Sequence, residues 1–160
     1  MRRATGLSRK RKPRFLYHGS SRRTDLLTPH QADDWRFGVG RNFGVYATSE
    51  RDVALAFALG GVADETGTCQ REMRKRERAR VEMIFVRGHP NYGGKGYLYK
   101  LSSKGFRHVG GTQWVCDCAV KPVATLEINV DDYLQLCRSA TPGERARFER
   151  GLRRSKKHGK

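Results

Sequence analysis

The distribution of charge along this chain limits which part of it can form a folded core. Residues 1–14 contain seven Lys or Arg and no acid, and residues 144–160 contain eight Lys or Arg and two Glu. Removing both ends from the formal net charge of +17 leaves +4 for residues 15–143. Segments this basic bury too little apolar surface to offset the entropy of ordering. We therefore expect one folded domain, residues 15–143, between two flexible basic tails.

The two tails have the composition of segments that bind polyanions. Each phosphate that a Lys or Arg neutralises releases condensed counterions, so a disordered basic arm gains affinity for DNA or RNA. The candidate nucleic-acid-binding residues are Arg9, Lys10, Arg11, Lys12, Arg153, Arg154, Lys156 and Lys157. The alternative, that the tails are only solvated ends, stays open. Neither tail interleaves aromatic anchors with its charges, which argues against a membrane surface as the partner.

The apolar residues of the chain do not predict a membrane segment. No run approaches the ~18 apolar residues of a membrane span, and no apolar core follows the basic start as in a signal peptide. We expect an intracellular, cytoplasmic protein, or a nuclear one in a eukaryotic host, because residues 9–14 match a basic nuclear address.

The cysteines do not have the close paired spacing of a zinc site. Cys116 and Cys118 are separated by one residue, and Cys69 and Cys137 are isolated. The histidines show no ligand spacing either. We expect reduced thiols and no metal site.

Short apolar runs bounded by Gly, Pro and Ser predict six strands. They cover residues 15–18, 43–48, 81–86, 97–101, 112–116 and 123–128. Ser49 with an acid three residues later predicts the N-cap of a helix that ends at Gly60. A short helix is also expected over residues 131–136, and the highly charged residues 65–80 predict either a solvent-facing helix, which we favour, or an inserted loop. Strands with helices placed irregularly between them favour an α+β fold over a regular βαβ array.

Two short motifs lie at the ends of the first two predicted strands. Tyr17-His18-Gly19-Ser20 ends the first strand, and Val45-Tyr46-Ala47-Thr48 leads directly into the predicted helix. In this order and setting they resemble the ADP-ribosyltransferase family, in which a strand that ends in His-Gly faces a strand that carries Tyr. The resemblance covers residues 15–60 and continues more loosely through residues 96–99 and 120–122.

The resemblance implies an ADP-ribosyltransferase-like core, a split mixed or antiparallel sheet with short helices, and NAD as co-substrate. It implies that Gly19, with Ser20 beside it, offers backbone groups to the nicotinamide carboxamide. His18 would bond a ribose hydroxyl, and Tyr46 would stack on the nicotinamide ring. We expect the side chains of His18 and Tyr46 to converge on one cleft, where the glycosidic bond is twisted towards an oxocarbenium-like state.

The third catalytic position of the family, a glutamate or similar residue on a later strand, corresponds to Gln113. A neutral amide can orient a ribose but does not stabilise positive charge as a carboxylate does. Asp117, four residues on, is the alternative. Two functions therefore stay open. One is mono-ADP-ribosyl transfer from NAD to a nucleic acid or a nucleic-acid-associated protein, and the other is noncatalytic nucleic-acid binding by the same fold.

Overall fold

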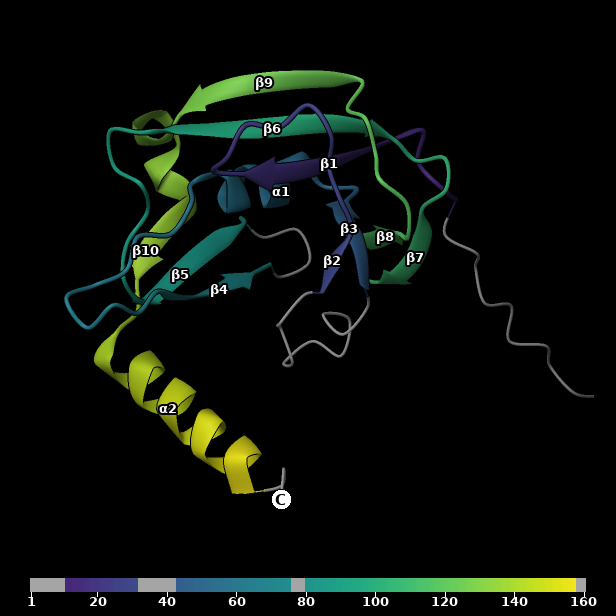
Figure 1. Ribbon diagram of the computed structural model, residues 1–160. Helices are drawn as coiled ribbons and strands as arrows, with labels where there is room; N and C mark the ends of the chain where they lie inside the picture. Colours follow the sequence, from purple (N-terminus) through teal and green to yellow (C-terminus); the bar gives the residue numbers. More distant parts are fainter. Residues whose placement is uncertain (1–10, 32–42, 76–79, 158–160) are drawn as a thin grey trace, which may run out of the picture.

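The computed structural model describes residues 11–31, 43–75 and 80–157 and has an α+β fold, as expected (Figure 1). Its elements are, in chain order, β1 (Phe15–Ser20), β2 (His30–Gln31), β3 (Phe43–Thr48), α1 (Arg51–Ala58), β4 (Gln70–Arg74), β5 (Glu82–Arg87), β6 (Lys95–Ser102), β7 (Arg107–Gly110), β8 (Gln113–Cys116), β9 (Ala124–Asn129), the 3-10 helix η2 (Val130–Leu136), β10 (Cys137–Ser139) and α2 (Pro142–Lys157). Each of the six predicted strands is present, with small shifts at its ends.

The larger sheet is antiparallel and divided in the middle. Its strand order is β7-β8-β3-β1-β6-β9, and β2 also pairs with β3. β1 pairs with β6 along its whole length, but with β3 only at Tyr17↔Thr48. Beyond that point β3 turns away from β1 and pairs with β2 at His30↔Gly44 (Figure 1). The sheet is therefore split between β1 and β3.

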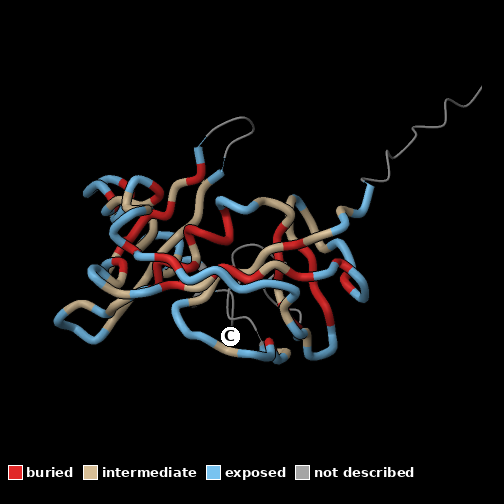
Figure 2. Tube along the Cα trace, turned by 90° about the horizontal axis from the view of Figure 1, so that it is seen from above, coloured by how far each residue is buried: buried red, intermediate tan, exposed pale blue. Residues whose placement is uncertain are grey.

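Helix α1 lies between the two sheets. Ala54, Leu55 and Ala58 pack with Leu98 of β6 in one buried cluster. The other side of α1 packs against the smaller sheet, whose order is β10-β5-β4, through a cluster of Val53, Ala56, Val81, Met83 and Phe85. Buried residues accordingly lie in the middle of the molecule, between exposed loops (Figure 2).

The far face of the larger sheet carries a core of its own. Its buried members are Leu16, Leu27, Val45, Ala47, Tyr99, Leu101, Phe106, Trp114 and Cys116. Strand alternation explains the division, because Leu16, Val45 and Ala47 point away from α1 whereas Tyr17 packs with the α1 cluster.

The prediction of a helix over residues 65–80 is wrong within the described part of this segment. Residues 70–74 form β4, which pairs antiparallel with β5 from Arg71↔Phe85 to Arg74↔Glu82. A helix of this composition would bury little besides Met73, whereas the strand satisfies the backbone groups on one edge of β5. Residues 76–79 lie outside the described residues. The N-cap of α1 is also one residue later than expected, at Glu50.

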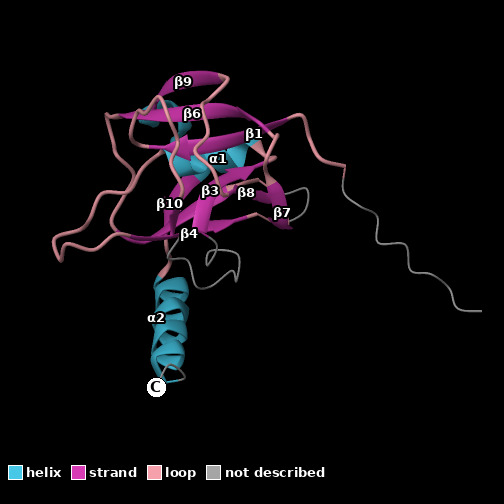
Figure 3. Cartoon of the chain, turned by 45° about the vertical axis from the view of Figure 1, so that its right-hand side comes forward, coloured by secondary structure: helices cyan, strands magenta, loops and turns pink. Residues whose placement is uncertain are grey.

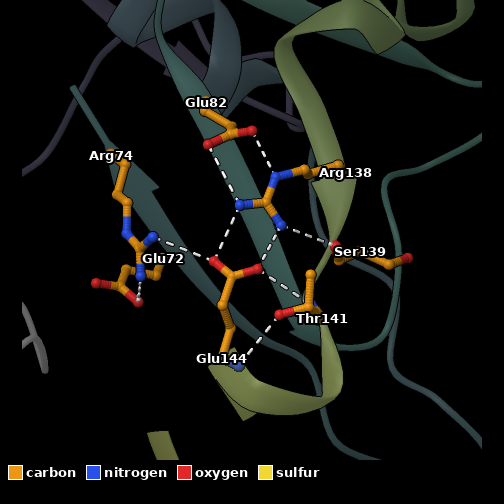
Figure 4. Close-up of polar contacts among 7 residues, drawn as sticks. All are labelled: Glu72, Arg74, Glu82, Arg138, Ser139, Thr141 and Glu144. Carbon is orange, nitrogen blue, oxygen red and sulfur yellow. Dashed lines mark hydrogen bonds and ion pairs between the residues drawn. The ribbon is translucent and has the colours of Figure 1, made fainter. Parts of the chain in front are cut away.

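The expected C-terminal tail begins instead as a helix, so the boundary at residue 144 is wrong. Helix α2 starts with a capping box formed by Thr141 and Glu144. Thr141 Oγ1 accepts from the Glu144 N–H at 3.2 Å, and Glu144 Oε1 accepts from the Thr141 N–H at 3.1 Å (Figure 4). These bonds satisfy backbone donors that every helix N-terminus exposes.

The first turn of α2 is fastened to the smaller sheet by charge. Arg138 of β10 donates from Nη1 and Nη2 to the two carboxylate oxygens of Glu144, at 2.6 and 2.9 Å, and also to Glu82 of β5 (Figure 4). Arg74 adds a hydrogen bond of 3.1 Å to the same buried carboxylate. Arg138, and then the Thr141 N–H, hold the pKa of Glu144 far below its usual value.

Acidification is expected to weaken this anchor. Glu144 has its ordinary pKa of 4.5 in the unfolded chain and a lower one in the fold, so the unfolded chain takes up the proton first. The stability contributed by the carboxylate is therefore present above about pH 4.5 and is lost as the pH falls towards the folded pKa. Urea unfolding of the wild type and Glu144→Gln should show a stability difference that shrinks from about pH 6 to about pH 3. A difference independent of pH would contradict this assignment.

The N-terminal boundary also differs from the expectation. Lys12 Nζ donates to the Phe106 carbonyl at 2.6 Å and lies 5.9 Å from the centre of a Trp114 ring. The Ser103 N–H donates to the Arg14 carbonyl at 3.1 Å. Residues 12–14 therefore belong to the folded domain, because their backbone and side chains find partners there.

Candidate functional site

The split in the larger sheet brings the two predicted motifs together. β1 and β2 pair with opposite ends of β3, and no described strand pairs with the stretch of that edge between them. The imidazole of His18 reaches this gap, with Nδ1 2.7 Å from the Tyr46 carbonyl oxygen. A carbonyl oxygen can only accept, so Nδ1 carries the proton and Nε2 is the acceptor of the ring. In the part of the chain that the structure describes, Nε2 makes no hydrogen bond.

The surroundings of His18 keep its ring neutral. Burial is the largest effect and lowers the pKa of His18, the Tyr46 carbonyl raises it, and the nearby His30 lowers it further. At neutral pH the ring is therefore uncharged, with a fixed donor on Nδ1 and an acceptor on Nε2. Such a group accepts a hydrogen bond from a hydroxyl without introducing charge into the site.

The backbone of Gly19 turns towards the same gap. In an antiparallel ladder the N–H and C=O of one residue point to the same neighbouring strand, and successive residues alternate. The Tyr46 carbonyl points towards β1, so the backbone groups of Thr48 do so as well, and those of its partner Tyr17 point towards β3. Gly19 is two residues after Tyr17, so its N–H and C=O also point towards β3. At this position β3 has turned away from β1 and does not pair with Gly19.

The glycine at position 19 is required by the helix rather than by a ligand. A Cβ on Gly19 would lie 1.7 Å from the carbonyl oxygen of Ala54 in α1. The family resemblance assigns only the backbone groups of Gly19 to the nicotinamide carboxamide. The structure shows that the backbone of α1 occupies the side-chain position, while the hydrogen-bonding groups of Gly19 point elsewhere.

Strand alternation makes the side chains of His18 and Tyr46 leave the sheet on opposite faces, and their convergence on one cleft stays a prediction. Tyr17 and Thr48 face each other, so Tyr46 shares their side of the sheet, the side of α1. His18 lies on the other side, where its ring is 6.1 Å from that of Tyr99. The ring of Tyr46 is 6.2 Å from that of His30. His18 and Tyr46 therefore meet through the Tyr46 carbonyl and border the gap from opposite sides.

The two candidates for the third position differ in their surroundings. Gln113 pairs with Thr48, is half-buried and projects on the same side as Tyr46. Asp117 follows the end of β8, its side chain is 71% exposed, and its carboxylate lies 3.8 Å from the guanidinium of Arg107. Gln113 is thus the better placed of the two, and no acid occupies its position.

Ser20 has a local role in the turn after β1. Its Oγ accepts a hydrogen bond of 3.1 Å from the Arg22 N–H. This bond stabilises the bend that follows the strand, which is a common use of serine at such positions.

Two residues near His18 and Tyr46 were not identified from the sequence. Tyr99 is fully buried beside His18, and its hydroxyl donates to the Arg22 carbonyl and accepts from the Thr24 N–H, both at 2.9 Å. His30 reaches Tyr46 through the two-residue strand β2. Tyr99 could have been predicted as a neighbour of His18 from the pairing of β1 with β6. His30 could not, because β2 has only two residues and such a short strand has no recognisable sequence pattern.

The predicted nucleic-acid-binding residues fall into three groups. Arg9 and Lys10 lie outside the described residues. Lys12 is held by the fold, as shown above, and Arg11 beside it is exposed. The remaining four lie on α2, where the side chains of Arg153, Arg154 and Lys157 are exposed and Lys156 is described only by its backbone.

All four cysteines are unpaired thiols, and Cys118 is the exposed one. Over residues 11–31, 43–75 and 80–157, no three His, Cys, Asp or Glu side chains are grouped so that they could hold a metal ion. Within the same ranges no helix has the length and apolar character needed to cross a bilayer.

Comparison of this chain with models of protein families, with curated proteins and with solved structures finds no match.

Proposed function

We propose that this protein is an NAD-dependent mono-ADP-ribosyltransferase whose co-substrate binds at the gap between β1 and β3. The observation that carries the proposal is the hydrogen bond from His18 Nδ1 to the Tyr46 carbonyl, which leaves Nε2 as an acceptor for a ribose hydroxyl. Gly19 is next to it, with an N–H and a C=O that match the acceptor and donor of a carboxamide.

Tyr46 supplies an aromatic surface next to this position. Continuing the register from Tyr17↔Thr48 places Tyr46 across the gap from Gly19, with its ring on the α1 side. A flat, electron-poor nicotinamide ring stacks well on a phenol. The carboxamide bound to Gly19 and the ring on Tyr46 would hold the nicotinamide while the ribose remains with His18.

The reaction breaks one bond and forms one. The bond between ribose C1′ and the nicotinamide nitrogen breaks, and its electron pair leaves with nicotinamide. A nucleophilic oxygen or nitrogen of the acceptor then bonds to the oxocarbenium-like C1′ and loses its proton to solvent. The Gln113 amide can orient a ribose hydroxyl but adds no charge, which predicts slow turnover.

The acceptor that we propose is a nucleic acid or a protein bound to one. The support is the charge of +17 and its concentration near the two ends of the chain. Such ends raise the local concentration of a polyanionic acceptor near the site.

Noncatalytic nucleic-acid binding is the second candidate, and the neutral side chain at position 113 favours it. Without a carboxylate to stabilise the developing charge, the site would bind a ligand and not cleave it. The two candidates differ in what happens to nicotinamide.

Release of nicotinamide from labelled NAD tests the proposal. The wild type should release nicotinamide when incubated with DNA, RNA or cell lysate as a source of acceptors. His18→Ala and Tyr46→Ala should each lower the rate by about 10²-fold, because positioning of the ribose and of the leaving group is lost.

Two variants serve as controls for this assay. Tyr92→Ala and His89→Ala remove the same types of side chain at exposed positions in the loop between β5 and β6, and both should retain the wild-type rate. Absence of nicotinamide in every mixture, or equal rates for Tyr46→Ala and Tyr92→Ala, would reject the transferase and leave the noncatalytic candidate.

A further inference from the structure

Helix α2 has two chemically different faces. Glu144, Phe148 and Leu152 are spaced by four residues and form one stripe, whose Phe148 packs with a buried cluster on the outer side of β5. A 100° step per residue places five basic side chains within an arc of about 120° on the opposite side. These residues, all exposed, are Arg147, Arg150, Arg153, Arg154 and Lys157.

Both acids of α2 face the domain. Glu144 is bound by Arg138, and Glu149 Oε1 lies 3.9 Å from the guanidinium of Arg87 in β5. The helix contains no other acid. The five residues of the basic arc therefore share their side of the helix with no carboxylate of α2.

The helix extends away from the two sheets (Figures 1 and 3). It is fastened at its first turn by the capping box and by Arg138, and the basic arc begins only at Arg147. Basic residues three and four positions apart repel one another along this arc, which destabilises the helix in isolation. A bound polyanion would remove this repulsion, and the anchored first turn would hold the helix ready for it.

The dimensions of the helix favour duplex DNA over RNA. An α-helix is about 10–12 Å wide, and the major groove of B-DNA is about 12 Å wide. The major groove of A-form RNA is deep and narrow and does not admit a helix. The arc from Arg147 to Lys157 is about 15 Å long, which matches four to five base pairs. The arc consists of Arg and Lys alone, whose charges neutralise phosphates on a duplex of any sequence.

We infer that the basic arc of α2 is a docking surface for duplex DNA that binds its phosphates. The inference rests on the geometry of α2 and on no property of the gap at His18.

Fluorescence anisotropy of the full chain with a labelled duplex DNA of about 20 base pairs, over a range of salt concentrations, tests the inference. The triple variant Arg150→Gln, Arg154→Gln and Lys157→Gln should lower the slope of log K against log salt by about 3. At about 0.1 M salt its affinity should fall by on the order of 10²-fold. Circular dichroism should show that the variant keeps its helix, because Gln is a good helix former.

A matched single substitution distinguishes the arc from the overall charge. Arg145→Gln removes one charge from the same helix outside the arc and should change the affinity less than Arg150→Gln does. Equal effects of these two variants, or an unchanged salt slope for the triple variant, would overturn the inference. Equally tight binding of duplex RNA would overturn the assignment to DNA.

Failure of the DNA-binding inference can be distinguished from failure of the transferase proposal. The triple variant should bind NAD, measured by calorimetry in the absence of nucleic acid, with the wild-type affinity, because none of its substitutions borders the gap. Loss of DNA binding with intact NAD binding supports the inference on α2 alone.

Discussion

Gly19→Ala is expected to destabilise the protein by about 3 kcal/mol or more, as overpacking against a rigid partner does. The new Cβ would lie 1.7 Å from the Ala54 carbonyl oxygen and 2.9 Å from the Ala58 nitrogen. Both atoms belong to the backbone of α1, so no side-chain rotation relieves the overlap. Helix α1 would have to move away from β1 and open the clusters on both of its sides. Urea unfolding followed by circular dichroism measures the loss.

A glycine without close neighbours provides the control. Gly151 lies in α2 and a Cβ there would meet nothing within 4 Å. Gly151→Ala should therefore stabilise the protein by about 0.5–1 kcal/mol, through the lower entropy of the unfolded chain and the better helix propensity of alanine. Gly96→Ala, whose Cβ would lie 2.1 Å from the Ala58 carbonyl, should resemble Gly19→Ala. A stability of Gly19→Ala close to that of the wild type would show that α1 does not lie as closely on β1 as described.

Gln113→Glu is expected to raise nicotinamide release by about 10²-fold, the effect of one well-placed charged or donor group on a charged transition state. Position 113 is half-buried, pairs with Thr48 and lies on the same side of the sheet as Tyr46. A carboxylate there would face the positive charge that develops on the ribose as nicotinamide leaves. The rate is measured with labelled NAD at saturating concentration, so that a change in rate reports kcat and not the affinity for NAD.

Two further substitutions test whether the charge at this position is responsible. Gln113→Met keeps the length of the side chain without a polar group and should not exceed the wild-type rate. Asp117→Asn should have little effect, because this exposed carboxylate already lies beside Arg107. If Asp117→Asn abolishes release and Gln113→Glu leaves it unchanged, position 117 and not 113 is the third catalytic position.

The local elements of the fold were readable from the sequence. Short apolar runs bounded by Gly, Pro and Ser predicted β1, β3, β5, β6, β8 and β9, and the His-Gly and Tyr motifs were correctly placed at the ends of β1 and β3. The start of α2 was readable as well, because Thr141 precedes Pro142 at the first helical position and Glu144 stands three residues on. The density of basic residues after it hid this signal in the sequence analysis.

Two of the strands that were missed, β4 and β10, both depend on pairing with β5. β4 is highly charged and becomes a strand because the edge of β5 is available to it, and β10 pairs in parallel with β5 across more than fifty residues. Neither segment has a local pattern that separates strand from coil, since its stability comes from the backbone groups of another strand.

The sequence by itself determined the α+β class, the positions of the principal strands and the concentration of positive charge near the two ends, because these depend on composition and local periodicity. Only the tertiary structure decided that β1 and β3 separate after one pair, and that His18 reaches Tyr46 through its carbonyl rather than its ring. It also decided that Glu144 is a buried anchor and not part of a solvated tail. These features arise from contacts between residues that are distant in the chain, which no local pattern specifies.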